Sequence, residues 1–333
     1  MEMKHSVYIQ VEHLTTSFKL PHGGRLVAVN DISFDIHHGE ILGVVGESGS
    51  GKSVMAKSLL QLVPVPGTID SGKVFLNGVD ILTYSDKEMR SNIRGTEISM
   101  IFQEPMSALN PSFSVQWQIE EVLRLHTDLN KKERYERVLD ILRKVSIPDP
   151  EKRMKEYPHQ FSGGMQQRVL IAIALASSPR LLIADEPTTA LDVTVQADIM
   201  DFLEDMRQNN GPSILLISHN LNLVTERSDR IMVMYASRIM EMATSIDLVG
   251  NPLHPYTIGL MDSVPDMGKD GQKLTAIPGE LPNLAELGDG CVFYRRCSKA
   301  MSICKEVTPE LAKVGPEHYC SCHLYRALLD GGK

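Results

Sequence analysis

Eight consecutive residues in the first part of the chain have the types and spacing of a phosphate-binding loop. They are Gly46-Glu47-Ser48-Gly49-Ser50-Gly51-Lys52-Ser53, which matches the pattern G-x-x-x-x-G-K-S. In such a loop, backbone N–H groups close around β- and γ-phosphate oxygens, Lys52 supplies a positive charge, and the Ser53 hydroxyl can ligate Mg²⁺. An apolar run at residues 41–45 precedes the loop and a helical segment at residues 54–60 follows it. The sequence therefore predicts a site for a nucleoside triphosphate with Mg²⁺.

A second candidate anion site begins with Ser162, Gly163 and Gly164, which precede a long apolar-periodic segment. We expect this segment to be a helix with Ser162 as its N-cap. The two glycines leave backbone N–H groups uncovered at the positive end of the helix dipole, where anions bind. A serine and two glycines are common before helices. The prediction of an anion site here therefore depends on the phosphate loop before these residues and on the acidic residues after them.

Two further strands are predicted to end in polar residues that suit phosphate chemistry. The run at residues 181–184 ends in Asp185-Glu186, and the run at residues 214–217 ends in Ser218-His219. Asp185 can hold the water shell of Mg²⁺, and Glu186 can orient and polarise an attacking water. His219 would lie on the same carboxyl edge of a parallel sheet, where α/β proteins bind ligands, and would contact the γ-phosphate.

In this order, over residues 7–250, the motifs resemble those of the ATP-binding-cassette (ABC) ATPases. The resemblance implies that Phe18 stacks on adenine, although the residue type also suits a core position. It implies that Gln103 joins Mg²⁺ and the attacking water to a transporter interface. It makes Ser162-Gly163-Gly164 the family signature and places Ala190-Leu191-Asp192 on the loop that crosses to an opposing subunit. His219 corresponds to the switch histidine.

Four positions depart from the usual family pattern. Phe161 replaces a leucine and Met165 a glutamine in the signature, Asn220 stands where an aspartate follows the histidine, and Ser237 replaces a glycine. None of them removes a phosphate ligand or the catalytic carboxylate, so we expect an active ATPase. In the family this position lies where contacts hold the edge of the ATPase dimer, so those contacts depend on the side chain of Asn220.

The expected fold is α/β, a P-loop cassette with a RecA-like parallel core sheet. Short β-branched runs at residues 7–45 and 73–102, with turn signals such as Asn77-Gly78, predict antiparallel strands around the nucleotide site. Apolar residues at helical spacing in residues 115–146 predict part of an α-helical signature subdomain at about 104–178. In the cassette family this subdomain meets the membrane subunits, whereas ordinary helical packing is the alternative from the residues alone.

Composition narrows the class of protein. With 42% apolar residues the chain can bury a large core, and its net charge of −8 argues against a nucleic-acid partner. No run approaches the ~18 apolar residues of a membrane span, and the N-terminus lacks an apolar signal-peptide core. We expect a protein kept in the cytosol.

All five cysteines lie after residue 290, at Cys291, Cys297, Cys304, Cys320 and Cys322. Disulfides are not expected in a reducing cytosol. Thiolates gathered in one short segment suggest a bound metal or an iron–sulfur cluster. The gaps that separate Cys291, Cys297, Cys304 and Cys320 are wider than the C-x₂₋₄-C spacing of most structural zinc sites, which favours the cluster over zinc.

A narrower resemblance covers residues 251–333, the predicted C-terminal extension. Residues 251–257, 277–279 and 290–297 look like the C-terminal extension of dipeptide and oligopeptide importer ATPases. Some of those subunits carry a 4Fe–4S cluster on four cysteines. The likeness assigns Cys291, Cys297, Cys304 and Cys322 as its ligands, because Cys322-His323 matches the usual ending, and leaves Cys320 as the alternative.

These resemblances predict the energy-coupling ATPase of a peptide importer, at the cytoplasmic face of the inner membrane. Its partners would be a second ABC ATPase, identical or different, two permease subunits and an extracytoplasmic peptide-binding protein. An importer for nickel or another small solute is one alternative, and a soluble ABC ATPase is a less favoured one. The peptide itself is not named by this sequence.

Overall fold

The computed structural model describes residues 6–21, 23–102, 108–188, 193–209, 211–263 and 277–325. The chain divides into two compact units. The sheet unit comprises Tyr8–Asp35, Ile41–Leu82 and Ser218–Lys333, and the helical unit comprises Met1–Val7, Ile36–Glu40 and Thr83–Ile217.

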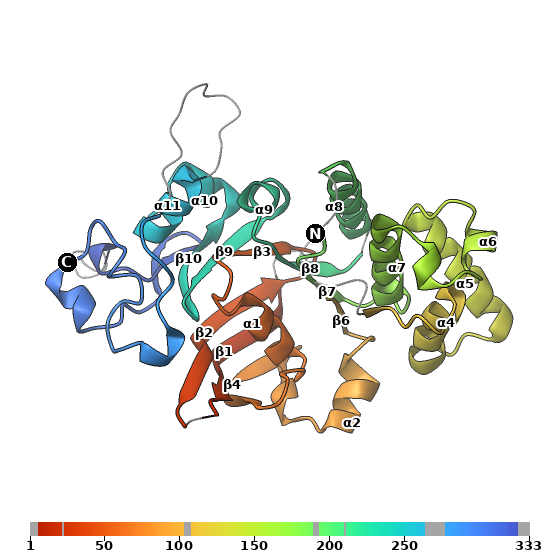
Figure 1. Ribbon diagram of the computed structural model, residues 1–333, viewed down its shortest axis with the longest axis horizontal. Helices are drawn as coiled ribbons and strands as arrows, with labels where there is room; N and C mark the ends of the chain where they lie inside the picture. The colour runs from red at the N-terminus through yellow and green to blue at the C-terminus, as the bar shows by residue number, and fades with distance from the viewer. Residues whose placement is uncertain are drawn as a thin grey trace. The chain divides into compact units, whose positions relative to one another are not determined.

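One sheet of the sheet unit has four strands in the order β2-β1-β4-β5 (Figure 1). Its strands are β1 (Val7–Lys19), β2 (Arg25–His37), β4 (Gly67–Leu76) and β5 (Val79–Asp80). β1 and β4 pair antiparallel and place Val11 opposite Val74, both buried in the core. Asn77 and Gly78 both have positive φ, of 50° and 82°, and close the predicted tight turn between β4 and β5.

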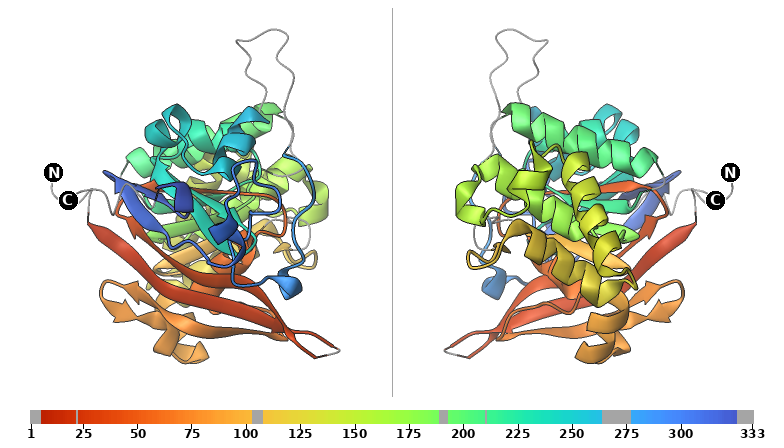
Figure 2. Two further views of the ribbon diagram at one scale, coloured as in Figure 1. Left: turned by 90° about the vertical axis from the view of Figure 1, so that its left-hand side faces the viewer. Right: turned by 90° about the vertical axis from the view of Figure 1, so that its right-hand side faces the viewer.

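The other strands of the sheet unit follow the order β11-β12-β10-β9-β3. They are β3 (Ile41–Val45), β9 (Arg230–Tyr235), β10 (Arg238–Thr244), β11 (Ala312–Gly315) and β12 (His318–Cys320). β3 and β9 are parallel, and every residue in both is buried. Continuous apolar runs of this kind are typical of strands covered on both faces. β10 pairs antiparallel with β9 and with β12, so the C-terminal segment extends this sheet (Figure 2).

The helices of the sheet unit are α1 (Lys52–Leu59), α9 (Leu221–Arg227), α10 (Ser245–Gly250) and α11 (Pro255–Asp262). Short 3-10 turns lie at Ile81–Thr83, Leu284–Glu286 and Ser302–Lys305. Along the chain, the first of these turns contains the boundary between the two units. α1 begins two residues before the predicted helical segment because Gly51, with φ of 101°, is its N-cap.

The helical unit has three parallel strands in the order β8-β7-β6. They are β6 (Ile98–Ile101), β7 (Leu181–Asp185) and β8 (Ser213–Ile217). The expectation of antiparallel strands throughout residues 73–102 is wrong here. Residues 86–93 form a helical turn (α2, Asp86–Glu88) and a π-helical turn (Met89–Ile93), and β6 pairs parallel with β7. Strand direction depends on a partner far away in sequence, which the local pattern does not reveal.

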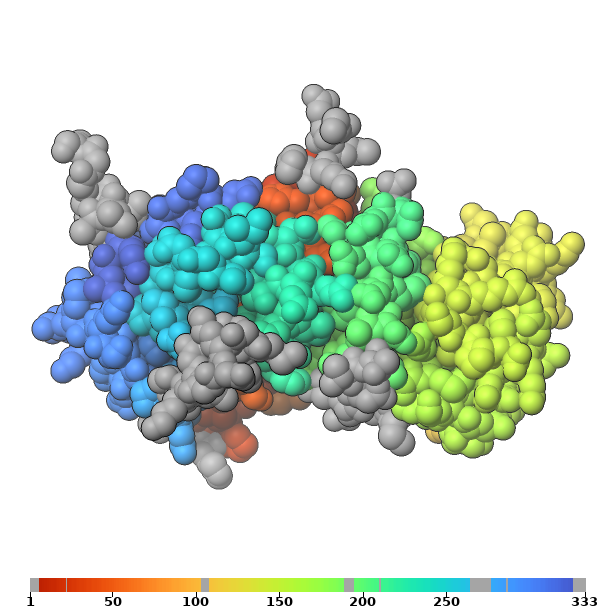
Figure 3. Space-filling view, turned by 90° about the horizontal axis from the view of Figure 1, so that it is seen from above, coloured from red at the N-terminus to blue at the C-terminus, as the bar shows by residue number. Residues whose placement is uncertain are grey.

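The remaining helices of this unit are α4 (Val115–His126), α5 (Lys131–Lys144), α6 (Pro150–Arg153), α7 (Gly163–Leu175) and α8 (Val193–Gln208), with a 3-10 turn at Pro158–Gln160. α4, α5 and α7 pack together, and their surfaces adjoin in the space-filling view (yellow to green, Figure 3). The predicted helical segment at 115–146 is two helices, since Asn130 caps α5 in a capping box with Glu133. Among the described residues, no helix is long and apolar enough to cross a membrane.

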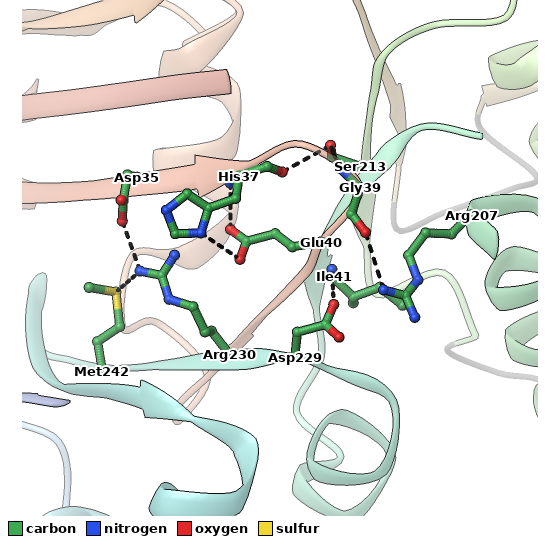
Figure 4. Close-up of polar contacts among 10 residues, drawn as sticks. All are labelled: Asp35, His37, Gly39, Glu40, Ile41, Arg207, Ser213, Asp229, Arg230 and Met242. Atoms are coloured by element: carbon green, nitrogen blue, oxygen red, sulfur yellow. Dashed lines mark hydrogen bonds and ion pairs between the residues drawn. The ribbon is translucent and has the colours of Figure 1, made fainter. Parts of the chain in front are cut away.

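Polar contacts within the helical unit fix the turn at residues 37–40, which follows β2 in the sequence (Figure 4). The Gly39 N–H donates to Ser213 Oγ at 2.8 Å, and Ser213 Oγ donates to the His37 carbonyl at 3.1 Å. Arg207 of α8 donates to the Gly39 carbonyl at 3.1 Å, and Glu40 accepts from the His37 N–H at 2.7 Å. These bonds hold residues 37–40 against the start of β8.

Within the sheet unit, two charged residues fix the start of β3, the strand that leads into the phosphate loop (Figure 4). Asp229 accepts a hydrogen bond from the Ile41 N–H at 2.7 Å. The next residue, Arg230, is buried and donates to Asp35 at 2.8 Å. β3 therefore enters the phosphate loop from a fixed position.

Candidate functional site

The phosphate loop joins β3 to α1 and depends on glycine at two positions. Gly46 has φ of 153°, and a Cβ there would lie 2.1 Å from the Met234 carbonyl oxygen. Gly51 has φ of 101°, and a Cβ there would lie 2.1 Å from the Ala28 carbonyl oxygen. Neither distance is tolerated by a real side chain, so the loop's close approach to two other strands requires glycine at both positions.

Lys52 lies inside the loop and is buried. Its Nζ donates to the Gly46 carbonyl at 2.8 Å and to the Glu47 carbonyl at 3.0 Å, and lies 3.4 Å from Ser50 Oγ. The loop's own oxygens thus hold the ammonium at the centre of the turn. This is where a point charge can serve phosphate oxygens bound by the surrounding N–H groups.

Ser237, which stands in place of a common glycine, supports the same loop. It has φ of 72°, a left-handed conformation that costs energy for a residue other than glycine. Its N–H donates to the Ser50 carbonyl at 3.0 Å, and its Oγ donates to the Val27 carbonyl at 2.7 Å. The hydroxyl bond offsets part of the backbone strain, so this departure leaves the loop supported.

Phe18, the predicted adenine contact, lies near the end of β1 and is half-buried. It pairs in register with Gly67 of β4, and its ring lies against the Gly67 backbone. One side of the residue is therefore covered by the sheet while part of it stays accessible. Stacking on adenine stays a prediction.

His219 and Asn220 follow β8 and lead into α9, and both are exposed. Asn220 is the N-cap of α9, because its side chain accepts from the Leu223 N–H at 3.3 Å. Its own N–H donates to Ser218 Oγ at 3.0 Å. Asn220 thus performs the capping role that an aspartate could also perform, and it fixes the backbone next to His219.

Asp185 and Glu186 lie at the carboxyl end of β7, as predicted. β7 and β8 are parallel with Asp185 opposite Ile217, so both strands end at one edge of the helical unit's sheet. Asp185 is buried, and Glu186 is half-buried. Glu186 has φ of 50°, and its N–H donates to the Ile217 carbonyl at 2.9 Å. The backbone of Glu186 is therefore held in an uncommon conformation, as happens at sites where side-chain direction matters.

The signature forms the N-terminus of α7, as predicted. Ser162 is the N-cap, and its Oγ accepts from the Met165 N–H at 3.4 Å. Ser162 and Gly163 are exposed, and a Cβ on Gly163 would meet nothing within 4 Å. Gln166 holds the preceding turn by donating to the Pro158 carbonyl at 2.9 Å. An accessible helix N-terminus thus faces open space within the described part of the unit.

The structure divides the predicted site residues between the two units. Phe18, the phosphate loop and His219 belong to the sheet unit, and Ser162, Gly163, Gly164, Asp185 and Glu186 belong to the helical unit. Gln103 and Asp192 lie outside the described residues.

The five cysteines are free thiols. Burial, with smaller contributions from the neighbouring Cys304, Cys322 and Cys297, raises the pKa of Cys291 to about 11. Burial also raises the pKa of Cys322, with Cys297 and Cys304 adding to the effect. The Cys291 N–H donates to the Cys304 carbonyl at 2.8 Å. Four of the thiols, those predicted as cluster ligands, therefore lie near enough to influence one another.

The predicted metal centre is not supported by this arrangement. Among the described residues, no group of three or more His, Cys, Asp or Glu side chains is arranged to hold a metal ion. Cys320, the alternative ligand, is buried in β12, where burial and the nearby Glu241 raise its pKa. The donor types suit iron–sulfur or zinc chemistry, but their described geometry does not form a ligand set.

Two residues of the C-terminal segment contact the phosphate loop and were not predicted. Tyr256 and Arg296 both bind Glu47. Both lie inside motifs that pointed to the importer extension, at residues 251–257 and 290–297. The only sequence signal for the Arg296 contact is an arginine next to a cysteine. That signal does not identify Glu47, 249 positions away in the sequence, as its partner.

Comparison with known families agrees with this geometry. The family model described as "ABC transporter" matches residues 29–189. The model described as "Oligopeptide/dipeptide transporter, C-terminal region" matches residues 240–304. The dimeric structure of MJ0796, described as a bacterial ABC transporter cassette, superposes with a TM-score of 0.64 at 27% identity, covering 71% of this chain and 98% of that one.

Full-length relatives extend the match over nearly the whole chain. The oligopeptide transport ATP-binding protein OppD of Bacillus subtilis is 46% identical over 313 residues, 93% of this chain and 87% of that protein. The dipeptide transport ATP-binding protein DppD of the same organism is 44% identical over 317 residues, 95% of this chain and 94% of that protein. The chain is thus an ABC-type ATPase with a P-loop α/β fold. It belongs to the oligopeptide and dipeptide transport ATP-binding proteins of the ABC transporter family.

Proposed function

We propose that this chain hydrolyses ATP to drive a membrane importer for dipeptides or oligopeptides. The observation that carries the proposal is a complete phosphate loop, with Lys52 at its centre, in a chain whose C-terminal region matches the oligopeptide/dipeptide transporter model. We take the cassette as residues 7–250 and the extension as residues 251–333.

The roles of the site residues follow from their chemistry and from the resemblance to the ABC ATPases. Lys52 and the loop N–H groups bind the β- and γ-phosphates, Phe18 stacks on adenine, and His219 contacts the γ-phosphate. Glu186 accepts a proton from the attacking water as a bond forms from that water to the γ-phosphorus. The bond from the γ-phosphorus to the bridging oxygen then breaks, leaving ADP and phosphate. Gln103 and Asp192, outside the described residues, would complete the site.

Oxygen donors suited to Mg²⁺ are present on this chain. The Ser53 hydroxyl lies in the first turn of α1, and the buried Asp185 carboxylate ends β7. Hydroxyl and carboxylate oxygens are ligands that Mg²⁺ prefers. Mg²⁺ held by Ser53, Asp185 and Gln103 would neutralise phosphate charge during hydrolysis.

A single chain has one phosphate loop and one signature, so we propose that it acts as a dimer with a second ABC ATPase. The accessible N-terminus of α7 at Ser162 and Gly163 supports this, because an exposed helix N-terminus can bind the γ-phosphate held by another subunit. The pair would work on two permease subunits and receive peptide from an extracytoplasmic binding protein. The chain would then lie peripherally at the cytoplasmic face of the membrane.

We further propose that Cys291, Cys297, Cys304 and Cys322 hold a 4Fe–4S cluster. The gathering of all five cysteines within residues 291–322 supports the proposal, and the described side-chain arrangement does not. Iron and acid-labile sulfide should be measured in anaerobically purified chain. Iron and sulfide that disappear in Cys297→Ser but persist in Cys320→Ser are the expected result, whereas zinc alone, or no metal, would refute the cluster.

The test of the function is isolation of the chain with its membrane partners from its natural host. We expect two permease chains to copurify, and the complex to release phosphate and take up labelled peptide. Lys52→Ala should reduce phosphate release to background. Copurification with no membrane chain would refute a transport role, and uptake of nickel without peptide would identify the substrate alternative.

A further inference from the structure

The C-terminal segment binds the phosphate loop directly, within the sheet unit. The Glu47 N–H donates to Tyr256 Oη at 3.0 Å. The Glu47 carboxylate accepts from Arg296 Nη1 with both oxygens, at 2.9 and 3.0 Å. Glu47 is the second residue of the loop, and its carbonyl accepts from Lys52 Nζ. The backbone and the side chain of one loop residue are therefore both held by residues outside the cassette motifs.

Both contacting residues are themselves firmly placed. Tyr256 is fully buried, and its ring packs against Tyr235 and Phe293 with centroids 4.6 and 5.3 Å apart. The guanidinium of Arg296 lies 5.6 Å from the centre of the Tyr235 ring, and its side chain is 8% exposed. An aromatic cluster thus supports the tyrosine hydroxyl and the guanidinium that meet Glu47.

Arg296 also joins the loop to the rest of the extension. Its Nε donates to the Pro278 carbonyl at 2.8 Å and its Nη2 to the Ile277 carbonyl at 3.3 Å. Arginine keeps its positive charge in proteins, and both oxygens of the Glu47 carboxylate accept from the Arg296 guanidinium. Arg296 directly precedes Cys297 in the sequence.

The charge of Glu47 makes this contact relevant to nucleotide binding. A carboxylate in a loop that binds a triphosphate repels the ligand unless a cation neutralises it. An ion pair that is largely shielded from water loses little of its strength to screening. Arg296 meets both conditions, because it is mostly buried and contacts both carboxylate oxygens.

We propose that Arg296 and Tyr256 are positioning residues of the nucleotide site, by which the C-terminal extension holds Glu47 and cancels its charge so that the loop can accept ATP. This role rests on the proposed function only in that ATP is the ligand of the loop. Through these two residues, the C-terminal extension raises the affinity of the phosphate loop in the same chain for ATP.

The test is titration of the 333-residue chain with a fluorescent ATP analogue, for the wild type and five variants. Arg296→Gln leaves the Glu47 charge unpaired, and we expect it to raise the Kd about fivefold or more, within the usual range of coupling between sites. Glu47→Gln removes the repelling charge, so the double variant Glu47→Gln/Arg296→Gln should bind within about twofold of Glu47→Gln. Arg295→Gln, the matched control, removes an exposed guanidinium that contacts Tyr294 and should leave the Kd unchanged. Tyr256→Phe keeps the ring and should raise the Kd by less than Arg296→Gln does.

A structural loosening of the extension would give a different pattern. If the double variant binds as weakly as Arg296→Gln, the loss comes from packing and the charge role is overturned. The same holds if the Arg296→Gln defect persists at high salt, because a bare charge on the accessible loop should be screened. Wild-type affinity in Arg296→Gln would overturn the positioning role alone, whereas a wild-type chain that binds no ATP would overturn the nucleotide site itself.

Discussion

Replacing Gly51 by alanine should destabilise the chain far more than the same change at Gly49, only two positions away. Both residues have positive φ, of 101° and 82°, so either alanine incurs about 1–2 kcal/mol of backbone strain. At Gly49 the new Cβ meets nothing within 4 Å, and strain is the whole cost. At Gly51 it would lie 2.1 Å from the Ala28 carbonyl oxygen, which belongs to the backbone of β2 and cannot rotate away. Relieving such an overlap adds about 1–3 kcal/mol.

The two variants should therefore differ by about 1–3 kcal/mol in the free energy of unfolding, with Gly51→Ala the less stable. Urea unfolding followed by circular dichroism, without nucleotide, measures this difference, because bound ligand would itself shift the stability. Equal stabilities for the two variants would show that the loop does not approach β2 as described. A larger loss at Gly49 would refute the reasoning outright.

Three further predictions concern other residues of the two units. Glu186→Gln should bind ATP normally yet release no phosphate, since the amide keeps the shape and lacks the base; hydrolysis at the wild-type rate would remove Glu186 from its role. Ser162→Arg should block hydrolysis by the assembled pair while sparing ATP binding to the isolated chain, and loss of that binding would place the signature in the same subunit's site. Burial lowers the pKa of His254 from 6.5 to about 4, and its Nδ1 accepts from the Tyr256 N–H, so the folded state keeps it neutral while the unfolded chain binds the proton first. Stability is therefore complete above about pH 6.5 and falls by roughly 3 kcal/mol as the pH approaches 4. The His254→Asn variant keeps an oxygen that can cap α11 but lacks the imidazole, so its stability should depend less on pH between 7 and 5. A slope equal to that of the wild type would show that His254 does not cause the pH dependence.

Local motifs were readable from the sequence because each is contiguous. The strand at residues 41–45, the turn at Asn77-Gly78 and the N-cap at Ser162 are all found where their residue types predict them. The strand is marked by its continuous apolar run. In the turn and the N-cap, an asparagine, a glycine or a serine performs a backbone task that neighbouring residues do not change.

Features that depend on distant partners were not readable in the same way. β6 was expected to be antiparallel, but it pairs parallel with β7, some eighty residues later in the chain. The contact of Arg296 with Glu47 joins residues 249 positions apart. The cysteine spacing suggested a metal centre, yet the described side chains do not form one. In all three cases the deciding information is the three-dimensional packing of segments that have no local sequence signature for each other.

The most direct test of the central claim is peptide-dependent phosphate release by the complex in lipid vesicles. With ATP inside and peptide with its binding protein outside, hydrolysis should rise on addition of peptide, and labelled peptide should accumulate in the vesicle lumen where the ATP is. The same complex with Lys52→Ala in this chain should show neither effect above background. Full peptide uptake and phosphate release by the Lys52→Ala complex would contradict the claim that this chain's phosphate loop powers transport.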